Sequence, residues 1–267
     1  MIRYVNSLVV IGIALFVTTS CTTTTEEENT KTETIPNEIA KANVEGEAYL
    51  EYLDFNDSLP KANSLYYSRE VNGQQEWTDV IMTLDDSSQI LKMVEQFLTA
   101  GSEAVCSNHF YFKDGYKYAS KQFFLETQDD STYFVEILSY YDKDEKVTAT
   151  KRRTAEYEDL LSREQYMVAP KQDCSAERAF DIVNQKGKFK TTFQGFAEFQ
   201  GFKYLVVGED AKDGYSSALV VQRMTPLLKE LRNDESDLLG VPLRVNFQTV
   251  NDDGSSQQIL FGVAREI

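Results

Sequence analysis

The chain is poor in the residues and motifs that most catalytic sites need. His109 is its only histidine, and one histidine cannot build a three-histidine or His-Glu-His zinc site. A serine–histidine–aspartate triad would have to use His109, but no Gly-x-Ser-x-Gly elbow is present to supply the serine. The Walker pattern and the Gly-x-Gly-x-x-Gly fingerprint are also missing. We therefore predict no metal, no cofactor and no enzymatic activity, and interpret His109 as a solvated strand residue beside Tyr111.

Positively charged residues are also scarce. The chain has 27 Lys and Arg against 43 Asp and Glu, a net charge of -16. Such a surface repels phosphate backbones and anionic lipid head groups, which argues against nucleic acid as a partner. Among so many carboxylates, the pair that glycoside hydrolysis needs cannot be singled out. A cell-envelope hydrolase, or an enzyme accessory, that uses unidentified carboxylates is therefore the alternative function.

Cysteine is rare, with three residues in the chain. If Cys21 is modified, Cys106 and Cys174 remain as an even pair in an exported protein, where disulfides are permitted. A bridge between them would close a loop of nearly 70 residues and could stabilise the fold by roughly 4 kcal/mol. The alternative is two free buried thiols.

The apolar run near the N-terminus is too short to span a bilayer. Residues 8–17 (LVVIGIALFV) give ten apolar residues, whereas a spanning helix needs about 20. A cation before the run and small residues after it are typical of a secretory signal. The segment Thr18-Thr19-Ser20-Cys21 resembles the lipobox of bacterial lipoproteins, although Thr18 stands where that family usually carries Leu. The resemblance implies that residues 1–20 are removed and Cys21 is acylated; an ordinary cleaved signal is the alternative.

Residues 21–36 are mostly Thr and Glu. A segment with so little apolar content cannot bury a core, so we expect a flexible acidic tether. The run Glu26-Glu27-Glu28 resembles the export signal of surface lipoproteins in the Bacteroidetes group. We expect a protein anchored to the outer membrane of a bacterial envelope, facing the periplasm or exposed at the surface.

Residues 37–170 predict an α+β, mostly β, domain: an antiparallel sheet with packed helices. A helix is expected over 37–52, and Asn72-Gly73 between two strand-like runs is a strong hairpin signal. The apolar spacing over 85–98 predicts a second helix. Aromatic strand-like runs, separated by turn residues, then follow to about residue 153.

Residues 171–267 predict a second domain whose main elements run as three strands, a helix and two strands. Thr225-Pro226 marks the start of that helix. The order is similar to the OB-fold, a small five-stranded, partly open barrel; a five-stranded sandwich is the alternative. OB-folds bind oligonucleotides, oligosaccharides or protein segments on one face. On such a face we expect four residues: Phe196, Tyr215, Arg244 and Gln248.

Together these patterns favour a non-enzymatic lipoprotein. It would bind a protein or glycan partner in the envelope, or help to assemble an envelope complex, and would contact the membrane through its N-terminal lipid.

Overall fold

The computed structural model describes residues 37–102, 104–252 and 255–266. The predicted signal (1–20), the lipidation site Cys21 and the tether (21–36) lie outside these residues. Contacts divide the chain into two units, Met1–Glu45 and Gly46–Ile267. Of the described elements, all but the first part of one helix belong to the second unit.

Strands dominate the described residues. The strands are β1 (Lys61–Asn63), β2 (Tyr67–Val71), β3 (Gln74–Leu84), β4 (Ile90–Leu98), β5 (Cys106–Lys113), β6 (Tyr116–Gln128), β7 (Ser131–Tyr141), β8 (Val147–Ala155), β9 (Met167–Val168), β10 (Thr192–Phe199), β11 (Phe202–Gly208), β12 (Ser216–Val220), β13 (Leu243–Asp252) and β14 (Ser255–Arg265). The helices are α1 (Asn37–Phe55), α2 (Glu158–Leu161), α3 (Glu177–Val183), the 3-10 helix η1 (Gly187–Phe189), α4 (Pro226–Asn233) and α5 (Glu235–Leu238).

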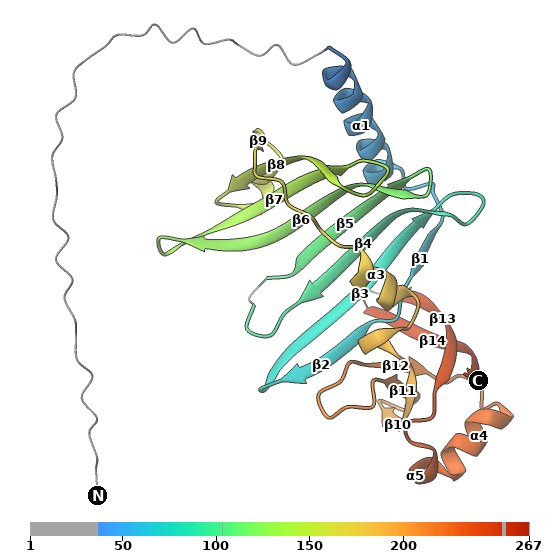
Figure 1. The fold of residues 1–267 in the computed structure, drawn as a ribbon. Helices are drawn as coiled ribbons and strands as arrows, with labels where there is room; N and C mark the ends of the chain where they lie inside the picture. The colour runs from blue at the N-terminus through green and yellow to red at the C-terminus, as the bar shows by residue number, and fades with distance from the viewer. Residues whose placement is uncertain (1–36, 103, 253–254, 267) are drawn as a thin grey trace, which may run out of the picture. The chain divides into compact units, whose positions relative to one another are not determined.

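The strands of the described residues form one open, mostly antiparallel sheet of 14 strands (Figure 1). Its main path runs β10-β11-β12-β2-β3-β4-β5-β6-β7-β8-β9, with β1 paired to β3 and the β13–β14 hairpin joined to β12. The β12–β14 contact is parallel. The mostly β, antiparallel character that the sequence predicts is therefore confirmed.

The C-terminal strands do not close into a separate barrel, and that part of the prediction is wrong. The element order of three strands, a helix and two strands is present, with the helical part divided into α4 and α5. However, Ser216 of β12 pairs with Ser68 of β2, so β10–β12 extend the N-terminal sheet. The edge of β12 is shared by β2 and, through Val220 and Ile259, by β14, so this edge joins the larger sheet and does not close a small barrel.

Two-residue turns connect several strands where the sequence predicts them. Asn72 and Gly73 have φ values of 53° and 78°, and Gln200 and Gly201 have 51° and 82°. Two successive positive φ angles are the signature of the type I′ turn, whose twist matches that of the flanking strands. These turns fix the register of the β2–β3 and β10–β11 hairpins.

The helix expected over 85–98 is instead strand β4. This strand pairs along its length with β3 on one side and β5 on the other, so its backbone is satisfied by neighbouring strands. Asp85, the first residue of that expected helix, accepts hydrogen bonds from the backbone N of Ser87 and of Gln89, both at 2.8 Å. Those bonds close the β3–β4 connection.

Apolar side chains cover both faces of the sheet. Phe110 and Tyr111 are neighbours on β5 and belong to different buried clusters, because successive strand residues point to opposite faces. The cluster that contains Tyr111 also holds Leu50 and Leu53 of α1. The cluster that contains Phe110 holds Ile182 of α3.

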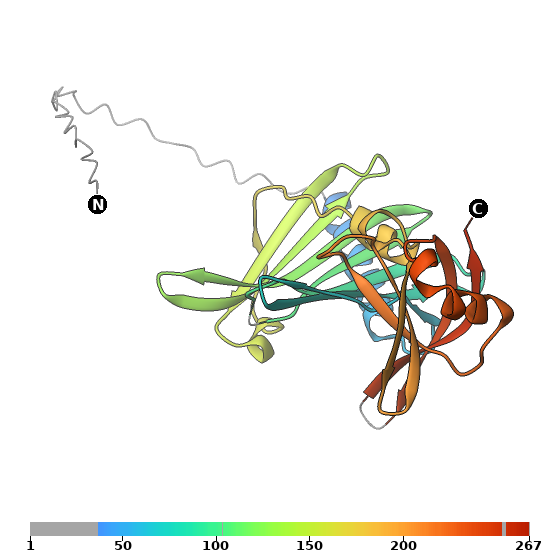
Figure 2. The ribbon, with the colours of Figure 1, turned by 90° about the horizontal axis from the view of Figure 1, so that it is seen from below.

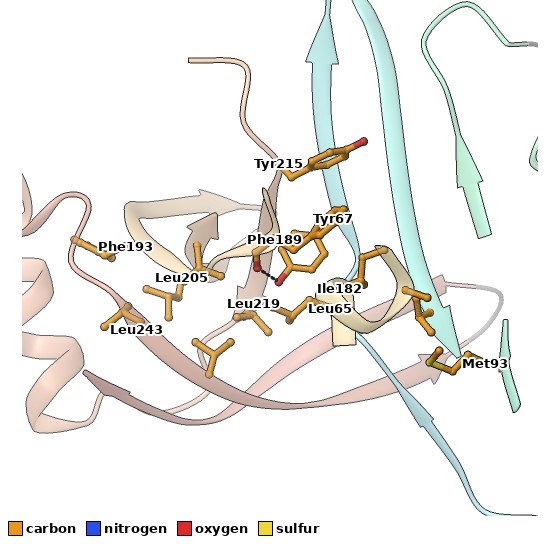
Figure 3. Close-up of a cluster of buried hydrophobic side chains, with 14 of the residues drawn as sticks. Leu65, Tyr67, Met93, Ile182, Phe189, Phe193, Leu205, Tyr215, Leu219 and Leu243 are labelled. Atoms are coloured by element: carbon orange, nitrogen blue, oxygen red, sulfur yellow. Dashed lines mark hydrogen bonds between the residues drawn. The ribbon is translucent and has the colours of Figure 1, made fainter. Parts of the chain in front are cut away.

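The larger cluster includes residues from both predicted domains (Figure 3). Tyr67 and Phe189 link its two parts, since the Tyr67 hydroxyl donates to the carbonyl oxygen of Phe189 at 2.7 Å and their rings are 5.1 Å apart. Leu205 and Leu219, from β11 and β12, are buried in the same cluster. The boundary between residues 170 and 171 stays a prediction.

The disulfide between Cys106 and Cys174 is not formed; both are free thiols. The carbonyl oxygen of Cys174 accepts a hydrogen bond of 2.7 Å from Lys117. Lys117 is the register partner of Phe112, which lies six positions along β5 from Cys106, about 20 Å at ~3.3 Å per residue. A disulfide requires Cα atoms within about 7 Å, so the strand register keeps the two sulfurs apart.

Candidate functional site

A polar groove with a volume of about 600 Å³ lies on the sheet face that carries Tyr111 and α1. We call this cavity the polar groove. Figure 2 shows the β10–β11 hairpin (orange) and the β13–β14 hairpin (red) projecting in the same direction. The lining side chains are Asn63, Ser64, Tyr66, Ser68, Asp79, Ile81, Tyr204, Val206, Ser216, Ser217, Ala218, Val220, Thr249, Asn251, Ser256, Gln257 and Gln258.

Strand alternation places these residues on one face. On β11, Leu205 is buried in the larger core cluster, while its neighbours Tyr204 and Val206 line the groove. Tyr204 pairs with Val220 of β12, and both point to the groove. The same strands therefore supply the core from one face of the sheet and the groove from the other, through alternate residues.

Gln258 of β14 forms hydrogen bonds with three other residues that line the groove. Its Nε2 donates to the carbonyl oxygen of Ser64 at 2.9 Å. Its Oε1 accepts from the backbone N of Tyr66 at 2.9 Å and from the hydroxyl of Ser217 at 3.4 Å. The segment between β1 and β2 is thus held against the β13–β14 hairpin, which gives the groove a fixed wall.

Asp79 supplies the only carboxyl group among the lining residues. Among the described residues its Oδ1 is buried and has no hydrogen-bond partner. Burial raises the pKa of the Asp79 carboxyl from 3.8 to about 6. Thr249 also has a buried hydroxyl without a partner among the described residues. Two residues that line the groove thus each carry a buried polar atom that the described residues leave unsatisfied.

An aromatic pair flanks the carboxyl group. The rings of Tyr66 and Trp77 stack with 5.6 Å between centroids and 26° between planes. Tyr66 is 40% exposed. Burial and the charge of Asp79 both raise the pKa of the Tyr66 hydroxyl, so this group is a neutral donor at neutral pH.

Two more aromatic side chains continue this face beyond the groove. Phe199 and Phe202 pair across the tip of the β10–β11 hairpin and are 63% and 46% exposed. Phe202 is two positions from Tyr204, so both side chains point to the same face. This face therefore offers a polar groove with an aromatic extension at its rim.

The four predicted ligand-face residues have different surroundings. Tyr215 is buried in the larger core cluster, where Arg69 lies 4.4 Å above its ring, and Phe196 packs against the same cluster. Arg244 and Gln248 are exposed on β13. None of the four lines the polar groove.

Sequence reasoning missed the residues that do line the groove. Asp79 and Gln258 are separated by 179 positions and become neighbours of one cavity only through the pairing of β2, β12 and β14. The one available signal was the polar character of strand positions on the face opposite the core, such as Ser68 and Ser216. The sequence alone does not predict the strand register that brings these positions together.

His109 is half-buried, so it is less solvated than the sequence predicts. Its ring centroid is 5.0 Å from that of Phe123. Burial lowers the pKa of the imidazole to about 3, and the charges of Lys92 and Lys121 act in the same direction. His109 is therefore a neutral packing residue at physiological pH, beside Tyr111 as predicted.

In residues 37–102, 104–252 and 255–266, no three His, Cys, Asp or Glu side chains are grouped so that they could bind a metal ion. The helices in this described part of the chain lack the length and apolar character that a membrane crossing requires.

Comparisons of the chain with protein-family models, with curated proteins and with solved structures found no match. The evidence for a function is therefore the geometry of the groove.

Proposed function

We propose that the chain is a non-enzymatic lipoprotein of a bacterial envelope whose polar groove binds a neutral glycan. The observation that carries this proposal is the composition of the groove: amide and hydroxyl groups among small apolar side chains, with one carboxyl group, beside the stacked pair Tyr66 and Trp77. Sugars present hydroxyl groups at their edges and C–H groups on their faces. The polar side chains suit the edges, and aromatic rings suit the faces.

Charge supports a neutral ligand. The groove contains no Lys or Arg among its lining residues, and the chain as a whole carries a net charge of -16. An anionic ligand would find no cation in the groove and would be repelled at long range. An uncharged polysaccharide segment meets neither obstacle.

The same composition argues for binding rather than cleavage. Canonical glycoside hydrolysis uses two carboxyl groups about 5–10 Å apart. Asp79 is the only carboxyl among the described residues that line the groove, so these residues supply no second group as nucleophile or base. Asp79 would instead bond a sugar hydroxyl.

Glycan binding is tested with the full chain in detergent, applied to an array of neutral polysaccharides. Tyr66→Ala removes the aromatic surface and Asp79→Asn removes the acid, and we expect each to weaken binding about tenfold, equivalent to about 1.4 kcal/mol. Tyr157→Ala is the matched control, because Tyr157 is 62% exposed and does not line the groove. Equal losses in all three variants, or no binding by the wild type, would refute the proposal.

The lipid anchor is a separate part of the proposal and depends on Cys21. Several acyl chains would hold the protein at the membrane, since each buried methylene contributes about 0.8 kcal/mol. Palmitate labelling of the wild type and of Cys21→Ala, with mass analysis of the mature N-terminus, tests the anchor. We expect label in the wild type alone, and an unlabelled wild type would contradict acylation.

A further inference from the structure

We propose that the ligand of the polar groove is a linear polysaccharide whose chain continues beyond the groove and packs on the rings of Phe199 and Phe202. This inference rests on the proposed function and names the class of glycan, an extended chain and not a single small sugar. Phe199 and Phe202 pair across the tip of the β10–β11 hairpin. We call their two exposed rings the aromatic tip.

Strand alternation puts the aromatic tip on the same face as the groove. Phe202, Tyr204 and Val206 occupy alternate positions on β11, so their side chains point the same way. Tyr204 and Val206 line the groove, and Phe202 follows about 7 Å farther along the strand. A ligand that lies along this face therefore passes from the groove to the aromatic tip without crossing to another surface.

The surface between the groove and the aromatic tip is open. Ala197 of β10 pairs with Tyr204, and Phe199 pairs with Phe202, so these four side chains share one face of the hairpin. Ala197 is exposed, and its methyl group rises little above the backbone. The three rings therefore stand beside a shallow position along which a chain of sugars can lie.

The opposite face of the hairpin is charged. The Nζ of Lys203 lies 3.7 Å from Oε1 of Glu198, and Arg232 lies 3.5 Å from the same oxygen. Lys203, which lies between Phe202 and Tyr204, is thus turned away from the aromatic tip and paired. Segments that dock on anionic membranes combine apolar residues with Lys and Arg. The aromatic tip lacks this combination, and an uncharged sugar face suits it better than a lipid surface.

The exposure of the rings and the size of the groove support an extended ligand. Phe199 is 63% exposed and Phe202 is 46% exposed, and large apolar side chains that lie together at a surface mark a contact site. The groove volume of about 600 Å³ encloses a drug-sized ligand, which is a short stretch of a polysaccharide. The remainder of the chain must leave the groove, and aromatic rings on the same face offer contacts to its C–H groups.

The test compares two fractions of the neutral polysaccharide that binds best on the array, short chains of about three sugars and longer chains of about ten. Calorimetry with the full chain in detergent measures both affinities. We expect the wild type to bind the longer chains about tenfold more tightly. Short chains that bind with no gain from length would overturn this inference and leave the proposed function standing. No binding of either fraction would refute the proposed function, and this inference with it.

Variants of the aromatic tip complete the test. Phe199→Ala combined with Phe202→Ala should abolish the gain with length and leave the affinity for short chains unchanged, because neither ring lines the groove. Phe261→Ala is the matched control, since Phe261 is 70% exposed and does not line the groove; it should keep the gain. A gain retained in the double alanine variant would overturn the inference and leave the aromatic tip for another partner, such as a lipid surface.

A leucine variant separates stacking from general apolar contact. Phe199→Leu combined with Phe202→Leu keeps two apolar side chains but removes both rings, and we expect it to lose the gain with length as the alanine variant does. A gain that survives in the leucine variant would contradict stacking of sugars on the rings. An equal loss of affinity for short and long chains in either variant would also contradict the proposal, because it would show a change in the groove itself.

Discussion

The ring of Tyr66 stacks on the indole of Trp77, with 5.6 Å between the ring centroids. Tyr66 lines the polar groove, and Trp77 is the only tryptophan of the chain. Any ligand that packs on Tyr66 therefore changes the surroundings of the single indole. This relationship gives a spectroscopic reporter for the proposed site.

We predict that a neutral glycan bound in the polar groove shifts the emission maximum of Trp77 to shorter wavelength. Tyr66→Ala should shift the emission of the free protein to longer wavelength, because the indole loses its stacked neighbour and meets water. Steady-state fluorescence with selective tryptophan excitation measures both effects. Ligand binding that leaves the emission of Trp77 unchanged would place the glycan elsewhere on the molecule.

Local signals in the sequence were sufficient for the turns and for several elements. Asn72-Gly73 adopts the two positive φ angles that the hairpin requires. Thr225 caps α4 by accepting a hydrogen bond from the backbone N of Leu228. Both features depend on neighbouring residues only, which is why residue type alone predicts them.

Elements whose identity depends on distant partners were predicted less well. The apolar residues of Ile90–Leu98 fit a helical period as well as a buried strand, and short apolar runs are ambiguous in this respect. Pairing with β3 and β5 decides the outcome. The Ser216–Ser68 pair joins the two halves of the sheet. Its members are 148 positions apart, so neighbouring residues in the sequence do not predict it.

Asp79 should make stability depend on pH. Because the pKa of its carboxyl is raised from 3.8 to about 6 in the folded chain, the folded state binds more protons than the unfolded state between these values. The free energy of unfolding therefore falls as pH rises from about 4 to about 6. The pKa difference corresponds to about 3 kcal/mol for a fully buried group; since Asp79 is partly exposed, we expect about half of that.

Asp79→Asn separates this effect from other titrations. The amide has nearly the same shape and no charge, so the variant should be about 1–2 kcal/mol more stable than the wild type above pH 6 and about equally stable below pH 4. Urea unfolding across this range measures the difference between the two proteins. A constant difference would show that the carboxyl does not titrate with a raised pKa.

Asp54 should be important for stability because it neutralises two lysines. Its carboxylate lies 2.6 Å from Lys92 and 2.6 Å from Lys121 and accepts a hydrogen bond from Tyr111 at 2.8 Å. Burial alone would raise the pKa of the Asp54 carboxyl, but the two lysines hold it below its usual value. Asp54→Ala leaves two largely buried ammonium groups unpaired, and we expect a loss of about 3 kcal/mol in urea unfolding.

Asp57→Ala is the control for that variant. Asp57 also pairs with a lysine, Lys61, but its side chain is 92% exposed. An exposed pair contributes little, so the loss should stay below about 0.5 kcal/mol. Similar losses in both variants would mean that the Asp54 network contributes no more than a surface pair.

Gly46 should resist replacement although it lies in helix α1. A Cβ atom at this position would overlap the hydroxyl oxygen of Tyr118. Gly46→Ala gains about 0.5–1 kcal/mol of helix stability but forces the neighbouring ring to move, which costs about 1–3 kcal/mol. We expect a net loss of about 1 kcal/mol, and a smaller loss when Gly46→Ala is made in a Tyr118→Phe background. A double-mutant cycle in urea measures this coupling, and a coupling of zero would contradict the contact.

The two thiols should differ in reactivity and should never form a bridge in the folded chain. Cys174 is 6% exposed, and burial raises the pKa of its thiol to about 12. Cys106 is half-buried, and burial also raises the pKa of its thiol. Because alkylation requires an accessible thiolate, iodoacetamide should label Cys106 slowly in the native protein and Cys174 only after unfolding. Mass spectrometry of the peptides measures the alkylation of each cysteine, with and without reductant. Alkylation of Cys106 and Cys174 in the unfolded chain only after reduction would show that the two are bridged.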